Sequence, residues 1–311
     1  MKKVIIGTRG SALALWQAHY IAKRLLEECQ LESEIKIVQT KGDKILDTPL
    51  SKIGGKGLFT KELEELLLHK EIDLAVHSLK DVPVVLPDGL NLCAITERED
   101  VRDCFLSLHY GSIAELPQGA RVGTTSLRRT MQVKSMRQDL QTQSLRGNVQ
   151  TRLKRLENGE FEGIILASAG LKRLGIQGEI PFCHFLSTQE MLPAMGQGAL
   201  GLESHQDSPF NAYFAMLNDP QTALLCGCER EFVKRLDGGC QVPIGVYAMM
   251  EDEAIVLEAK IGLPSGGQML RSKIKGQNAK EIATKLADEF LAQGAREILQ
   301  KAQEWDFSAT I

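Results

Sequence analysis

The sequence lacks long apolar runs, cysteine pairs of CxxC spacing and metal-binding histidine patterns. No stretch approaches the roughly 18 apolar residues that a membrane span needs. The seven cysteines form no CxxC pair, so neither a disulfide framework nor a zinc ribbon is predicted. The six histidines show no HExxH spacing, and no Ser-His-Asp order is evident. The sequence therefore predicts no metal centre, membrane span or disulfide scaffold.

What is present is typical of a globular protein of moderate size. The 311 residues, 43% of them hydrophobic and 25% charged, fit two or three domains. The net charge of −3 argues against a chain that coats nucleic acid. The start Met1-Lys2-Lys3 is followed by an apolar run, 4–6, that is too short for a signal peptide. We therefore expect a cytoplasmic protein that begins at Met1.

A strand–turn–helix pattern occurs twice. Residues 4–7 predict a strand, after which Ser11 suits a helix N-cap, and 121–123 predict a strand followed by Ser126 as a second N-cap. Each copy continues as strand, helix and strand. The remaining predicted strands are 34–40, 73–77, 141–145 and 161–167, and the remaining predicted helices are 59–70 and 148–156. This repetition indicates two similar α/β halves facing each other.

The pattern changes from about Thr222. A helix over 223–236 ends at Asp237-Gly238-Gly239, where paired glycines suit a C-cap. The three strands predicted next are 244–250, 254–261 and 268–274, and one long amphipathic helix over 279–302 follows them. This part predicts a separate α+β domain with Cys240 on its first connecting loop.

Positive charge gathers between Arg121 and Arg173, where eleven basic and four acidic residues leave a local charge of +7. Arg128 and Arg129 open a helix after a Gly-Thr-Thr-Ser turn, and Arg146 ends a strand. Helix N-termini and guanidinium groups both bind carboxylates or phosphates, so these three arginines predict an anion site. Four other cations read as an ordinary solvated helix face: Lys134, Arg137, Lys154 and Arg155.

The first half offers matching candidates. Arg9 and Ser11 occupy the equivalent turn, although an isolated arginine there could equally lie on the surface. The segment 52–57 is rich in Gly and Lys but lacks the Ser or Thr of a phosphate loop. It fits either a basic lid or a flexible linker.

Two further side chains have chemical potential. Asp81 follows a predicted strand, where it could stabilise a developing cation or merely pair with Lys80 in a turn. Cys240 is preceded by glycines that allow close approach of another group, and nearby arginines would favour its thiolate. An isolated cysteine is more often a packed, inert thiol. The residues alone leave both alternatives open.

Taken together, seven segments resemble the porphobilinogen deaminase family, in order and across most of 1–245. They are Thr8-Arg9-Gly10-Ser11 with 13–18, Gly54-Gly55-Lys56-Gly57-Leu58-Phe59, His77-Ser78-Leu79-Lys80-Asp81-Val82-Pro83, Gly123-Thr124-Thr125-Ser126-Leu127-Arg128-Arg129, Arg146-Gly147-Asn148-Val149, Pro193-Ala194-Met195-Gly196-Gln197-Gly198 and Gly238-Gly239-Cys240-Gln241-Val242-Pro243. Thr125 stands where the family more often has Ser, and 180–190 departs from its pattern.

The resemblance implies an α/β fold with two periplasmic-binding-protein-like domains facing a cleft and a smaller C-terminal α+β domain. Domain 1 would comprise 1–97 and 198–217, domain 2 would comprise 98–197, and domain 3 would comprise 218–311. The chain would cross twice between the first two domains.

The resemblance also implies a transferase of tetrapyrrole and heme biosynthesis, hydroxymethylbilane synthase. It would condense four porphobilinogen molecules onto a dipyrromethane cofactor attached through Cys240, then release hydroxymethylbilane by hydrolysis. Asp81 would be catalytic. The implied cofactor-binding residues besides Cys240 are Asp43, Lys80, Thr124, Ser126, Arg128, Arg129 and Arg146. The implied substrate-binding residues are Arg9, Ser11, Lys56, Phe59, Arg152, Arg173 and Gln197.

Two rival functions use the same features differently. A non-catalytic two-lobed anion-binding module would share the architecture but give no reason for Asp81 and Cys240 to accompany the arginines. A nucleic-acid binder would use 121–173, yet no Phe, Tyr or Trp lies between Arg121 and Glu160 to stack on bases. We expect a monomer whose partner is a small molecule, with neither nucleic acid nor a membrane involved.

Overall fold

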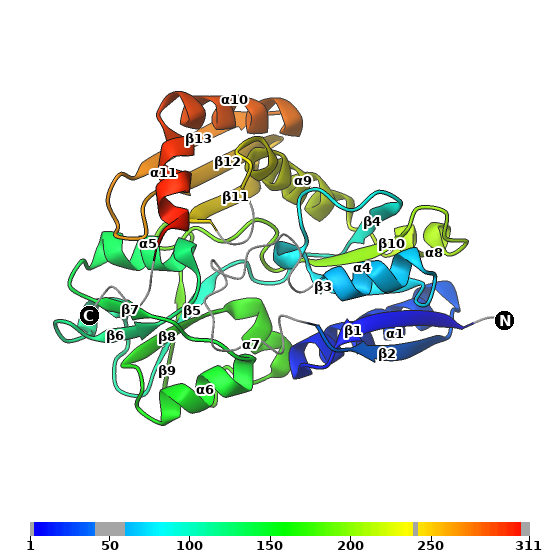
Figure 1. Ribbon diagram of the computed structural model, residues 1–311, viewed down its shortest axis with the longest axis horizontal. Coiled ribbons are helices and arrows are strands. Elements are labelled where there is room, and N and C mark those ends of the chain that lie inside the picture. The colour runs from blue at the N-terminus through cyan, green and yellow to red at the C-terminus, as the bar shows by residue number, and fades with distance from the viewer. Residues whose placement is uncertain (1–2, 41–59, 239–241, 306–311) are drawn as a thin grey trace. The chain divides into compact units, whose positions relative to one another are not determined.

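The computed structural model describes residues 3–40, 60–238 and 242–305 and separates them into two compact units (Figure 1). Of the described residues, the first unit contains 3–40, 60–99 and 196–224. The second contains 100–195, 225–238 and 242–305. The first unit is therefore built from segments that are far apart in the sequence.

The first unit has a five-stranded sheet in the order β2-β1-β3-β10-β4. Its strands are β1 (Val4–Arg9), β2 (Ser33–Val38), β3 (Leu74–Ser78), β4 (Leu90–Ile95) and β10 (Leu200–His205). β1 runs parallel to β2 and β3, whereas β10 runs antiparallel to β3 and β4. The helices of this unit are α1 (Ala12–Cys29), α4 (Lys61–Leu68) and α8 (Asn211–Met216), and a 3-10 turn, η1 (Leu79–Asp81), follows β3.

The second unit repeats this topology in a sheet of order β7-β6-β8-β5-β9. Its strands are β5 (Asp103–Ser107), β6 (Arg121–Gly123), β7 (Gln141–Gln143), β8 (Gly163–Ala167) and β9 (Phe182–Leu186). β6 runs parallel to β7 and β8, and β5 runs antiparallel to β8 and β9. Helices α5 (Leu127–Met136) and α6 (Val149–Glu157) connect the parallel strands, α7 (Ser168–Leu174) follows β8, and a 3-10 turn, η2 (Ile113–Glu115), precedes β6. The predicted repeat of two similar α/β halves is confirmed.

Polar N-caps start the helices at the ends of these strands. Ser11 Oγ accepts a hydrogen bond from the Ala14 N–H, and Ser126 Oγ accepts one from Arg129 N–H. These bonds satisfy backbone donors that the first helical turn leaves unpaired. Both predicted caps are confirmed, and each begins a helix directly after a parallel strand.

The C-terminal part is a three-stranded antiparallel sheet with two helices packed against it (Figure 1). Helix α9 (Pro220–Arg235) leads to β11 (Ile244–Glu251), β12 (Ala254–Ile261) and β13 (Leu270–Gly276). Apolar residues of alternating positions bury one face of β12, as the period of a strand requires. The predicted fold class, two α/β sheets plus a smaller α+β region, is confirmed.

Two details of this region differ from expectation. The predicted single helix over 279–302 is two helices, α10 (Ala279–Ala292) and α11 (Ala295–Gln303), because Gly294 adopts a left-handed φ of +88° between them. At the end of α9, the left-handed residue is Asp237, with φ +51°, and Gly238 donates from its N–H to Val233 O. An aspartate tolerates this conformation better than most residues with a side chain.

Candidate active site

A small cavity lies in the first unit at the carboxyl ends of β1 and β3. These strands are adjacent and parallel, so the residues that follow them meet at one edge of the sheet, where ligands of open α/β sheets bind. The cavity has a volume of about 90 Å³. It is lined by Arg9, Ser11, Leu13, Ala14, Gln17, Thr60, Val76, His77, Ser78 and Asp81. The structure thus brings together three predicted site residues, Arg9, Ser11 and Asp81.

Local hydrogen bonds fix the walls of this cavity. Thr8 Oγ1 donates to Ala14 O at 3.1 Å, which ties the end of β1 to the first turn of α1. Gln17 Nε2 donates to Ser78 Oγ at 2.9 Å, which joins α1 to the end of β3. Because these bonds hold strand ends and helix together, Ser11 and Asp81 stand on rigid elements.

Sequence analysis did not predict two buried carboxylates near the cavity, Glu203 and Glu64. His77 Nε2 lies 3.0 Å from Glu203 Oε2, and Thr60 Oγ1 donates to Glu64 Oε1 at 2.6 Å. Burial raises the pKa of Glu64, and the nearby Glu203 carboxylate raises it further. His77 belongs to one of the family-like segments, but its partner lies 126 residues away in the sequence. Strand pairing alone could have revealed that contact.

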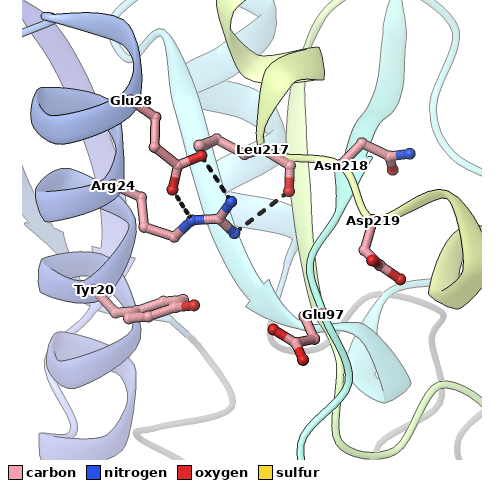
Figure 2. A pocket seen from close by; sticks show the side chains of 7 residues that line it. All are labelled: Tyr20, Arg24, Glu28, Glu97, Leu217, Asn218 and Asp219. Atoms are coloured by element: carbon pink, nitrogen blue, oxygen red, sulfur yellow. Dashed lines mark hydrogen bonds and ion pairs between the residues drawn. The ribbon is translucent and has the colours of Figure 1, made fainter.

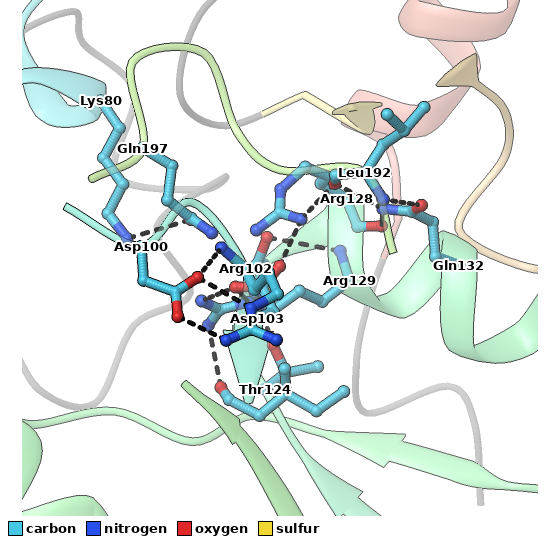
Figure 3. A network of polar contacts seen from close by, with 12 residues as sticks. Lys80, Asp100, Arg102, Asp103, Thr124, Arg128, Arg129, Gln132, Leu192 and Gln197 are labelled. Carbon is cyan, nitrogen blue, oxygen red and sulfur yellow. Dashed lines mark hydrogen bonds and ion pairs between the residues drawn. The ribbon is translucent and has the colours of Figure 1, made fainter. Parts of the chain in front are cut away.

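Lys80 and Gln197, two more predicted site residues, meet in the first unit. Lys80 Nζ donates to Gln197 Oε1 at 3.4 Å, as Figure 3 shows, and Gln197 is fully buried. Arg98 Nε donates to the backbone oxygen of Gln197 at 2.8 Å. The amide of Gln197 therefore holds the Lys80 ammonium just after β3 and one residue before Asp81.

In the second unit, Arg128 and Arg129 share one buried carboxylate (Figure 3). Arg128 Nη1 lies 2.6 Å from Asp103 Oδ2, and Arg129 Nη2 lies 2.7 Å from Asp103 Oδ1. Arg128 also donates to Leu192 O, and Arg129 donates to Ile165 O. Two cations against one anion leave a local excess of positive charge.

The electrostatics of Asp103 follow from that pairing. Burial alone would raise the pKa of Asp103, but the charges of Arg128 and Arg129 outweigh it and hold the pKa well below its ordinary range. Burial lowers the pKa of Arg128, and the Asp103 carboxylate opposes that shift. Sequence reasoning missed Asp103, which stands at the start of an apolar strand.

The remaining predicted residues of the second unit follow three neighbouring parallel strands. Thr124 and Ser126 follow β6, Arg146 follows β7, and Arg173 lies on the helix after β8. Thr124, Ser126 and Arg146 come just after their strands and therefore share one edge of the sheet, whereas Arg173 lies near the end of α7. Thr124 Oγ1 accepts from Ser126 N–H at 3.2 Å, which shapes the turn. The edge thus carries two hydroxyl-bearing residues and Arg146.

Arg152 and Arg146 lie beside the same turn. Arg152 Nε donates to Gly147 O at 2.8 Å, and Gly147 adopts a left-handed φ of +106°. A Cβ at that position would come within 2.7 Å of Thr151, so the turn requires glycine. Burial lowers the pKa of the half-buried Arg146. A partly desolvated guanidinium at a strand end is well suited to a carboxylate.

The helix-face interpretation holds for two of the outlying cations. Arg137 pairs with Asp139 at 2.7 Å, and Arg155 pairs with Glu160 at 2.8 Å. Such partly exposed ion pairs contribute little to the free energy of folding. Four predicted site residues, Asp43, Lys56, Phe59 and Cys240, lie outside the described residues.

A larger cavity of about 300 Å³ in the first unit contains none of the predicted site residues (Figure 2). It is lined by Tyr20, Arg24, Glu28, Glu97, Leu217, Asn218 and Asp219. Arg24 pairs with Glu28 and donates to Leu217 O, and Asp219 Oδ1 accepts from Thr222 N–H at the start of α9. These contacts hold helices in place, and none of the lining residues is a predicted site residue. The greater volume of this cavity therefore does not make it the active site. The smaller cavity is the candidate site, because three predicted site residues line it.

Fold and site together define an α/β enzyme with arginines and a carboxylate at the carboxyl ends of parallel strands. The family described as "Porphobilinogen deaminase, dipyromethane cofactor binding domain" matches residues 4–211, and "Porphobilinogen deaminase, C-terminal domain" matches residues 223–292. The chain belongs to the porphobilinogen deaminase family, whose members are transferases.

Curated relatives agree over nearly the whole chain. The porphobilinogen deaminase of Helicobacter acinonychis is 57% identical over 97% of this chain and 99% of its own length. That of Helicobacter hepaticus is 54% identical over 99% of this chain and 98% of its own length. Among solved structures, a Salmonella typhimurium periplasmic binding protein is similar, with a TM-score of 0.42 and 13% identity over 72% of this chain and 94% of that one.

The described residues also fit the cofactor that the family name specifies. A dipyrromethane of the kind implied by the resemblance carries several carboxylates, and the residues that follow β6 and β7 in the second unit include Thr124, Ser126 and Arg146. Among the residues that the structure describes, no helix is long and apolar enough to cross a membrane.

Proposed function

We propose that the chain acts as hydroxymethylbilane synthase. It condenses four porphobilinogen molecules head to tail on a dipyrromethane primer, then releases hydroxymethylbilane by hydrolysis. Membership of the porphobilinogen deaminase family supports the reaction. One observation supports the assignment of the catalytic residue: Asp81 lines the same small cavity as Arg9 and Ser11.

The cavity residues suit the substrate's charges. Each porphobilinogen carries an acetate, a propionate and an aminomethyl group, so a binding site needs cations for the first two. Arg9 can take a carboxylate bidentately, and Ser11 can donate its O–H while its oxygen accepts the α1 cap bond. Lys80, which Gln197 holds close by, adds a second cation. These groups would orient the aminomethyl carbon toward Asp81.

Asp81 would stabilise the charge that develops as ammonia leaves. Breaking the carbon–nitrogen bond of the aminomethyl group spreads positive charge onto the pyrrole nitrogen, and a nearby carboxylate lowers the energy of that cation. A carbon–carbon bond then forms to the free ring carbon of the acceptor, and the proton on that carbon is lost. When bound, the dipyrromethane supplies the first acceptor carbon.

The second unit would hold the carboxylates of the primer and the growing chain. Arg146 and Arg152 lie at the turn after β7, Arg173 lies on the helix after β8, and Thr124 and Ser126 add hydroxyl donors after β6. Arg128 and Arg129 contribute positive charge that Asp103 only partly offsets. In this assignment Cys240 is the covalent anchor, Asp43 contacts the cofactor, and Lys56 and Phe59 contact the substrate.

We also propose the setting in which this enzyme works. Its domains would be 1–97 with 198–217, then 98–197, then 218–311. It would act in the cytoplasm as a monomer, with porphobilinogen as its partner and neither nucleic acid nor a membrane involved. Gel filtration coupled to light scattering tests the monomer directly.

The decisive experiment separates catalysis by Asp81 from attachment of the dipyrromethane primer. Asp81→Asn keeps the size of the side chain but removes its charge, so ammonia release should fall by about 10²–10³-fold, while intact mass still shows the dipyrrole adduct. Asp88→Asn, an exposed aspartate of the same unit, should leave the rate unchanged. Wild-type turnover in Asp81→Asn would reject the catalytic assignment. An unmodified yet active Cys240→Ser protein would reject the tether.

A further inference from the structure

Two cysteines of the second unit bring their sulfur atoms into contact. Cys104 lies in β5 and Cys183 in β9, and their Sγ atoms are 3.0 Å apart. The strands pair antiparallel, with Cys104 opposite Phe185 and Leu106 opposite Cys183. The cysteines are therefore diagonal neighbours on one face of the sheet. Since a disulfide joins sulfurs about 2.0 Å apart, small side-chain rotations would suffice to form the bond.

The two thiols differ in access to solvent. Cys104 is fully buried in the core of the second sheet, and burial together with the neighbouring Cys183 raises its pKa far above the usual range. Cys183 is only half-buried and lies in the edge strand. A dissolved reagent therefore meets Cys183 first, and Cys104 can react only with a partner already attached beside it.

We propose that Cys104 and Cys183 form an intramolecular disulfide when the protein meets a low-molecular-weight disulfide such as glutathione disulfide. The Cys183 thiolate attacks one glutathione sulfur, forming a mixed disulfide and releasing one glutathione thiolate. The Cys104 sulfur then attacks the Cys183 sulfur of the mixed disulfide, and its proton passes to the second glutathione sulfur as that sulfur leaves, so the second glutathione departs as a thiol. Two cysteine thiols are oxidised and one disulfide is reduced to two thiols, so atoms and electrons balance.

The proposed disulfide would affect β5, the strand whose first residue binds two buried arginines. β5 begins with Asp103, directly before Cys104, and Asp103 holds Arg128 and Arg129. Among the strands that the structure describes, β9 lies at the edge of its sheet, and edge strands open more readily than central ones. Tying β9 to β5 would therefore slow local opening next to Asp103. The melting temperature of the oxidised protein should rise, and amide exchange in β9 should slow.

The experiment uses the full-length holoenzyme and glutathione disulfide, with peptide mapping by mass spectrometry. In the wild type, a peptide containing Cys104 should become linked to one containing Cys183, and dithiothreitol should reverse this. Cys104→Ala should stop at a stable glutathione adduct on Cys183. Cys183→Ser should leave Cys104 unmodified. Cys29→Ser, which removes another half-buried thiol, should cross-link as the wild type does.

Other results would overturn the proposal. One is a wild-type protein that stays fully reduced at Cys104 and Cys183, or that accumulates only a mixed disulfide on Cys183. Another is oxidation of Cys104 in Cys183→Ser at the wild-type rate. Because the readout is a cross-linked peptide from folded protein, it does not depend on turnover. Its failure would leave the proposed function untouched, and loss of activity in Asp81→Asn would leave the cross-link untouched.

Discussion

The imidazole of His77 contacts the carboxylate of Glu203, with Nε2 and Oε2 3.0 Å apart and the two side chains only 4% and 0% exposed. Oε1 of Glu203 has no hydrogen-bond partner within the part of the chain that the structure describes. A buried carboxylate that makes so few hydrogen bonds depends strongly on the partner it has. His77 in turn lines the candidate cavity.

Removing that partner should destabilise the first unit. Glu203→Ala leaves His77 buried without its contact, and we expect a loss of about 1–3 kcal/mol in the free energy of unfolding. Glu203→Gln, which keeps a hydrogen-bonding group of the same size, should lose less. Urea unfolding measures both. Glu27→Gln, on the exposed face of α1, is the control and should change little. Equal stability of Glu203→Ala and wild type would contradict the prediction.

Asp103→Asn should be more damaging than any change at a surface pair. It removes the negative charge that partly offsets Arg128 and Arg129 in a buried setting, at a cost of about 3–5 kcal/mol. Asp139→Asn removes the partner of Arg137 in a partly exposed pair and should cost far less. Chemical denaturation of both variants tests the contrast. Comparable stability of the two would mean that the Asp103 pairing contributes little.

Glu64 should make stability depend on pH in a direction opposite to that of most carboxylates. Its folded pKa lies above the ordinary value of 4.5, mainly because of burial. The folded state therefore holds a proton that the unfolded state loses, and this contribution is present below pH 4.5 and lost as pH rises through the folded pKa.

The comparison with Glu64→Gln isolates this effect. Asp103, whose pKa is lowered, contributes stability that disappears only as pH falls, and it does so in both proteins. The stability of wild type relative to Glu64→Gln should thus decline from pH 4.5 toward neutral. Unfolding by urea at a series of pH values gives that difference. A flat difference would show that Glu64 titrates normally in the folded protein.

Arg9 should matter for binding more than for folding. If its guanidinium holds a substrate carboxylate, Arg9→Leu loses a charge-assisted hydrogen bond, and kcat/KM should fall by roughly tenfold to a hundredfold. The free energy of unfolding should stay close to that of the wild type. Arg137→Leu, which removes a cation paired with Asp139, should leave kcat/KM unchanged. An equal decrease in both variants would point to a general effect of charge.

Local signals made much of the fold predictable. Ser11 and Ser126 were recognisable as N-caps because their hydroxyl groups precede periodic apolar residues, and both accept a backbone N–H. The strand 254–261 has the bounds that its alternation predicts. The helix predicted over 279–302 was wrong in one respect, since Gly294 ends α10 and starts α11.

Long-range contacts escaped prediction for a physical reason. The strands that run antiparallel in each sheet include β5 and β10, which are buried on both faces and have no amphipathic repeat, so no periodicity identified them. Their neighbours are set by tertiary pairing, which also places Glu203 beside His77 and Cys104 beside Cys183. The arginines could be predicted because clustered charge and turn position can both be recognised within a short stretch of sequence. Asp103 could be recognised only from its contacts with Arg128 and Arg129 in the folded protein.

The position of β10 has a consequence for biosynthesis. β10 pairs with β3 and β4, yet it begins at Leu200, about a hundred residues after β4 ends. At translation rates of about 5–20 residues per second, β3 and β4 emerge from the ribosome several seconds before their shared neighbour exists. During that interval the nascent N-terminal sheet has open strand edges, so chaperone occupancy should be greatest before Leu200 appears.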